Sequence, residues 1–143
     1  MQHNASNIYS TMQKDGLSGR ALEAQVLTRS ANMLKECQNR WGEEGHESRL
    51  DTAVRFNQKV WTFFQTELSE PENPLPKEIR ENLLNLSIFI DSRLIDVLIN
   101  PAPELLSAVI NINVNIAAGL MDKPHPETRS SATDEPKNIA ISA

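Results

Sequence analysis

The residues whose types could do chemistry are few, and the densest group is Glu43, Glu44, His46 and Glu47. Carboxylates and an imidazole this close together could hold a divalent metal ion. Charged side chains in a glycine-bounded segment more often form a solvated connection, which is the interpretation we favour. The 143 residues contain no Gly-rich phosphate loop, His-Glu-x-x-His, Cys-x-x-Cys or Gly-x-Ser-x-Gly. The sequence therefore predicts a protein that is not an enzyme and that needs no metal or cofactor.

Three further side chains could have a chemical role but have a simpler explanation. Asn85 and Asn113 interrupt apolar stretches and could contact a ligand, although such residues are more often satisfied core amides that bridge helices or bond a neighbouring turn. Cys37 is the only cysteine, so it cannot form an internal disulfide. Between Met33 and Trp41 it is predicted to be a small buried side chain and not a reactive thiol.

The elements that position these residues are predicted to be helices, because apolar residues recur at spacings of three or four. Long helices are expected over 19–41, 47–69, 76–99 and 104–121, with a shorter one over 1–15. Residues 109–116 alternate apolar and polar side chains as a strand would, but the chain offers no partner strand, so a helix is favoured. The predicted fold is all-α, a compact bundle of about five helices.

The predicted core is organised around residues 50–99. One helical face carries six residues at core spacing, namely Leu50, Val54, Asn57, Trp61, Phe64 and Leu68. Three prolines within 70–76 end this helix and preset the start of the next, which predicts a helical hairpin. Residues 1–121 form one predicted helical domain, and 122–143, rich in proline and small polar residues, form a predicted disordered tail.

Charge and hydropathy limit the partners. The net charge is −5 and the 14 basic residues are scattered singly, which argues against direct nucleic-acid binding. No apolar run is expected to reach the roughly 18 to 20 residues of a membrane-spanning helix, and the polar start of the chain opens no secretory signal. The sequence therefore predicts a cytoplasmic protein without a membrane contact.

The last two predicted helices carry more apolar surface than a small bundle needs. Residues 76–99 bear a second stripe, formed by Leu84, Ile88, Ile95 and Ile99. One helix wrapped on all sides would explain part of this surplus, and the first helix or a second copy of the chain could cover the rest. Otherwise it forms a groove for an amphipathic helix of a partner. The candidate groove residues are Leu106, Ile110, Val114, Met121, Leu84, Ile88, Phe56 and Phe63.

The order and spacing of several segments resemble the FlaF family of flagellar biosynthesis regulators of α-proteobacteria. These segments are Asn4-Ala5 with Tyr9, Glu23-Ala24-Gln25-Val26-Leu27 leading to Ala31 and Leu34, Phe56-Asn57-Gln58-Lys59-Val60-Trp61-Thr62, Leu75-Pro76 with Ile79-Arg80, Asn82-Leu83, Asn85-Leu86-Ser87-Ile88-Phe89, Ile112-Asn113 and Ile116-Ala117-Ala118-Gly119-Leu120. Together they extend over nearly all of residues 1–121.

The resemblance implies an all-helical cytoplasmic protein needed for flagellin production and export. On this basis we expect a flagellin-specific secretion chaperone that also promotes flagellum assembly, with flagellin as its partner and FlbT, a regulator of flagellin translation, as a second one. An alternative is a post-transcriptional regulator of flagellin that acts mainly through FlbT. A helical homo-oligomer is compatible with either role.

Overall fold

The computed structural model describes residues 19–122. In this range four α-helices and one 3-10 turn follow one another: α2 (Gly19–Asn39), α3 (His46–Ser69), α4 (Lys77–Ile99), η1 (Pro103–Leu106) and α5 (Ser107–Met121). The all-α prediction is confirmed, with four α-helices where about five were expected. The helix predicted over 1–15 and the disordered tail predicted beyond residue 122 lie outside the described residues.

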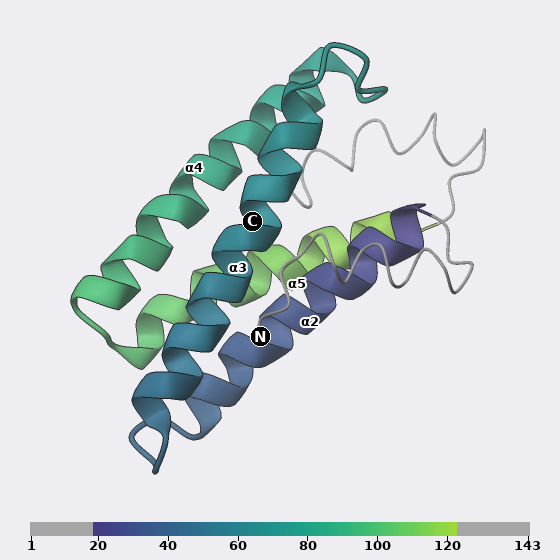
Figure 1. Ribbon diagram of the computed structural model, residues 1–143. Helices are drawn as coiled ribbons and strands as arrows, with labels where there is room; N and C mark the ends of the chain where they lie inside the picture. Colours follow the sequence, from purple (N-terminus) through teal and green to yellow (C-terminus); the bar gives the residue numbers. More distant parts are fainter. Residues whose placement is uncertain (1–18, 123–143) are drawn as a thin grey trace.

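The helices form two pairs that meet at one end. Helices α2 and α5 run side by side, and α3 and α4 form the predicted hairpin (Figure 1). Helix α2 also contacts α3, whereas α4 lies against α3 and η1. The far ends of the two pairs diverge in Figure 1. Among the elements of residues 19–122, α4 therefore has only α3 and η1 as close neighbours.

The stretch with strand-like alternation lies inside α5, so the helical interpretation is confirmed. Its buried members include Val109, Ile112 and Ala117, which share one helical face. Within the described residues, Pro103–Met121 is the one helical segment long and apolar enough, by length and composition, to cross a membrane. The segment includes Glu104, Asn111, Asn113 and Asn115, so it is not an unbroken apolar run of the kind that the sequence analysis considered. In this structure the segment packs along α2 as part of the core.

Trp61 lies at the centre of the core and is 2 % exposed. Its indole Nε1–H donates to Asn113 Oδ1 at 3.0 Å, which links α3 to α5. The Asn113 amide in turn donates to Asn57 Oδ1 at 2.8 Å and to Ser30 Oγ at 2.9 Å. The prediction that Asn113 is a satisfied core amide is thus confirmed. Asn85 is exposed, so the same prediction is wrong for it.

The same network ties α3 to α2. Asn57 Nδ2 donates to the backbone oxygens of Ala53 at 2.9 Å and Ser30 at 3.1 Å, and Ser30 Oγ donates to Leu27 O at 2.8 Å. Each amide hydrogen of the two asparagines therefore has an acceptor, although both side chains are fully buried. Buried polar groups cost little only when they are paired in this way, so the network fixes how the three helices fit together.

One partly buried carboxylate opposes folding at neutral pH. Burial raises the pKa of Glu23 in α2, the charge of Glu67 raises it further, and Arg20 lowers it by a smaller amount. A pKa above the unfolded value means that the folded chain holds this proton more tightly. The stability contributed by Glu23 is therefore greatest at acid pH and is lost as the pH rises through the raised pKa.

Replacing Glu23 with glutamine is expected to raise the melting temperature by a degree or two near neutral pH and to give no gain below about pH 4. Thermal unfolding followed by circular dichroism at several pH values measures this difference. Glu72→Gln, an exposed change in the loop between α3 and α4, is the control for loss of one negative charge. An equal gain in melting temperature at all pH values, or an equal gain in the Glu72→Gln control, would contradict the view that the buried Glu23 carboxylate destabilises the fold at neutral pH.

Candidate interaction surface

The acidic loop that most resembled a metal site is held by contacts within the chain. Gly42 and Gly45 both have φ of 82°, a backbone conformation that glycine adopts without strain. Arg49 Nη2 donates to Arg40 O at 3.1 Å and its Nη1 to Glu44 O at 3.2 Å. Across residues 19–122 no group of three His, Cys, Asp or Glu side chains is placed to hold a metal ion. The loop is therefore a structural connection between α2 and α3.

Cys37 has the surroundings predicted for it. Its side chain is fully buried, and Sγ contacts Arg49 O at 3.6 Å. Burial is the main cause that raises the pKa of the Cys37 thiol, against a smaller lowering by the Arg49 charge. A thiol that is both hidden and protonated is a poor nucleophile.

Three of the eight predicted groove residues lie in the core. Leu106 is fully buried, and Ile110 and Phe56 are each 6 % exposed. The prediction that these three line an open groove is wrong, because Phe56 of α3, Leu106 of η1 and Ile110 of α5 all belong to the buried core cluster. Phe63 is half-buried, with its ring 5.7 Å from that of Phe64.

Val114 and Met121 are 47 % and 59 % exposed, but both lie on α5 and not on α4. They stand seven residues apart and so share a helical face. Met121 borders a shallow groove along α2, which places this face near α2 and not beside α4. The structure therefore does not bring the α5 residues and the α4 residues into one groove.

Within residues 19–122, most of the exposed large apolar side chains lie on α4. We call Leu84, Ile88, Ile95 and Ile99 the α4 stripe. Ile88, Ile95 and Ile99 are 64 %, 48 % and 75 % exposed, and Leu84 is half-buried. At 3.6 residues per turn the four lie within about 60° of the helix circumference. A contiguous apolar row of this kind on a folded chain is typical of an interaction surface.

Polar side chains border the α4 stripe on both sides. Towards α3, Gln65 Nε2 donates to Ser87 Oγ at 3.0 Å and to Asp91 Oδ2 at 2.9 Å. On the other side Glu81 and Asp96 are exposed, and Glu81 has only a loose contact with Lys77, at 3.9 Å. These residues border the α4 stripe, and exposed Phe89, under the Arg93 guanidinium, lies on α4 outside it.

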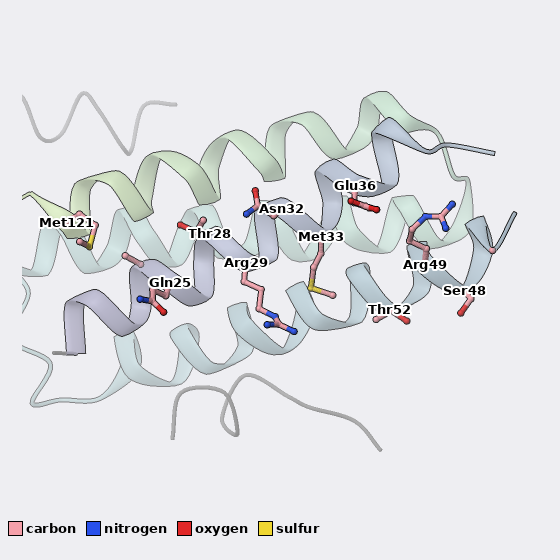
Figure 2. A pocket seen from close by; sticks show the side chains of 12 residues that line it. Gln25, Thr28, Arg29, Asn32, Met33, Glu36, Ser48, Arg49, Thr52 and Met121 are labelled. Atoms are coloured by element: carbon pink, nitrogen blue, oxygen red, sulfur yellow. The ribbon is translucent and has the colours of Figure 1, made fainter. Parts of the chain in front are cut away.

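A second surface feature was not found from the sequence. Figure 2 shows the shallow groove along α2, with Ser48, Arg49 and Thr52 of α3 near one end and Met121 at the other. Most of its lining residues have polar side chains, although the surface that they expose to the groove is mainly apolar. Its two arginines are already engaged, because Arg49 binds loop carbonyls and the Arg29 guanidinium lies 5.7 Å from the Phe56 ring. The α4 stripe is therefore the better candidate for a protein partner.

Comparison with known proteins gives one match. The model of a family described as flagellar protein FlaF matches residues 5–120 of the chain. No curated protein and no solved structure matches.

Proposed function

Because the chain belongs to the FlaF family of flagellar proteins, we propose that it is a secretion chaperone that binds flagellin and promotes flagellum assembly. In this proposal the α4 stripe covers the apolar face of an amphipathic flagellin helix in the cytoplasm. Flagellin subunits polymerise through amphipathic terminal helices, so these faces must be covered before export.

The observation that carries the proposal is the exposure of the α4 stripe. Three isoleucines in one row, between 48 % and 75 % exposed, lose contact with water when an amphipathic helix lies along them. Recognition of this kind pairs apolar residues at spacings of three, four and seven on both helices. It uses shape and hydrophobic contact, and no step of it requires a nucleophile or a metal.

Replacing Ile88 or Ile95 with aspartate is expected to weaken flagellin binding by about tenfold or more, because a charge would be placed in the centre of the contact. Both side chains face solvent, so the variants should stay helical and melt close to the parent. Co-purification with flagellin from the same cell, mass determination of the complex and titration of the purified proteins measure the effect.

Val114→Asp is the matched control, since it puts the same charge at an exposed apolar position on α5. Ile110→Asp is unsuitable because that side chain is buried. Full binding by both α4 variants together with loss in Val114→Asp would move the contact to α5. A parent chain that ignores flagellin but binds FlbT would replace the chaperone role with regulation through FlbT.

A further inference from the structure

The gaps within the α4 stripe read the same in both directions. Its members are separated by four, seven and four residues. If two copies of α4 lie antiparallel, with the midpoint between Asp91 and Ser92 on a two-fold axis, Leu84 of one copy is level with Ile99 of the other. Ile88 is then level with Ile95. A two-fold interface requires one surface to complement itself, and this spacing meets that requirement.

We propose that a second copy of this chain covers the α4 stripe through antiparallel, two-fold pairing of α4 with α4. Gaps of four and seven keep the four side chains on one narrow face of α4, as a seam between two helices requires, and the seam position between Ile88 and Ile95 is occupied by Asp91. In this register residues 84–99 of the two copies lie side by side, which is about two thirds of the 23-residue helix. Among the described elements α4 contacts α3 and η1, and the stripe is exposed beside these contacts.

Charge favours the antiparallel arrangement over the parallel one. In a parallel pair, the exposed carboxylates of Glu81 and Asp96 would each be level with the same residue of the other copy. Like charges placed together in this way disfavour a contact. In the antiparallel pair Glu81 lies level with position 102 and Asp96 with position 87, neither of them charged. The two Asp91 carboxylates lie close together in both arrangements, each bound by Gln65 Nε2 on the α3 side, so Asp91 does not distinguish between them.

The pairing also relates to the proposed function without depending on it. A second copy and a flagellin helix would cover the same four side chains, so they would compete. The dimer then keeps the α4 stripe out of water while no flagellin is present. Ile88→Asp and Ile95→Asp should abolish both contacts, and the two proposals are separated by measurements on the chain alone.

Sedimentation of the purified chain without any partner tests the pairing first. We expect a dimer at micromolar concentrations, monomers for Ile88→Asp and Ile95→Asp, and a dimer for Val114→Asp, whose exposed side chain lies on α5. A monomeric parent, or a dimer that both α4 variants leave intact, would overturn the proposal. Either result would leave flagellin binding to be decided by its own titration.

Disulfide trapping tests the direction of the pairing. Ser92 lies beside the two-fold axis, so Ser92→Cys is expected to form a disulfide with its own copy under mild oxidation. The two copies of Glu81→Cys would be about 30 Å apart at 1.5 Å per residue and should not be linked. Cys37 is fully buried and can remain in both variants. Equal disulfide formation by both variants would show a parallel pair and overturn the antiparallel arrangement. The absence of a disulfide in Ser92→Cys would also overturn the antiparallel arrangement.

Discussion

Trp61→Ala is expected to lower the free energy of unfolding by about 3 to 5 kcal/mol, the cost of removing a large aromatic side chain from a packed core. Trp61 is 2 % exposed and packs edge-on against Phe64, with ring centroids 5.8 Å apart. The substitution leaves a cavity and also removes the donor to Asn113 Oδ1. Urea unfolding of the parent and the variant, followed by circular dichroism, measures the difference.

Two further variants separate the contributions at this position. Trp61→Phe keeps most of the ring volume but removes the N–H, so it should cost less than the alanine change, about 1 to 3 kcal/mol. Trp41→Ala is the matched control, because Trp41 is only half-buried and its ring contacts that of His46 at 4.3 Å near the start of α3. If Trp61→Ala unfolds at the same urea concentration as the parent or as Trp41→Ala, Trp61 does not lie at the centre of the packed core.

The helices and most of their bounds could be predicted because they depend on local patterns. The apolar period of 3.6 residues marked each described helix, and the prolines of 70–76 marked the hairpin turn. Residues 109–116 show how such signals compete. Their alternation favours a strand locally, but a strand needs a partner, and α5 instead buries its apolar side chains against α2.

The candidate surface could be predicted only in part, because exposure depends on which helices meet. Leu106, Ile110 and Ile88 have the same apolar character and similar helical spacing in the sequence. The first two are buried where η1 and α5 meet their neighbours, whereas Ile88 is 64 % exposed on a helix with fewer neighbours. Sequence periodicity gives the number of apolar faces on a helix, and only the packing shows which of them is covered.

The polar network illustrates a second limit. Asn113 could be recognised as a core amide because it interrupts an apolar run. Ser30 gave no such signal, since a serine on an amphipathic helix is ordinary, and its position between Leu27 O and Asn113 Nδ2 depends on how α2 meets α5. Hydrogen bonds between residues 83 positions apart have no local pattern that would reveal them.

Asn113→Ala is expected to lower the free energy of unfolding by about 2 to 5 kcal/mol, because it leaves buried partners without hydrogen bonds. The Trp61 N–H and Asn57 Oδ1 would each lose the one side-chain partner that the network provides. The matched control is Asn111→Ala, an exposed position on the same helix, which should change stability by about 0.5 kcal/mol or less. Urea unfolding of both variants gives the comparison.

A double-mutant cycle decides whether the network acts as a unit. Trp61→Phe removes the donor that Asn113→Ala would leave unpaired, so the two changes together should cost less than the sum of the single changes, by about 1 to 2 kcal/mol. Strict additivity would mean that the 3.0 Å contact between Nε1 and Oδ1 contributes nothing to stability. A cost for Asn113→Ala equal to that of Asn111→Ala would show in addition that the loss of the Asn113 side chain leaves no buried partner unsatisfied. If the double variant costs less than the sum of the two single variants, Asn113 is the link between α3 and α5.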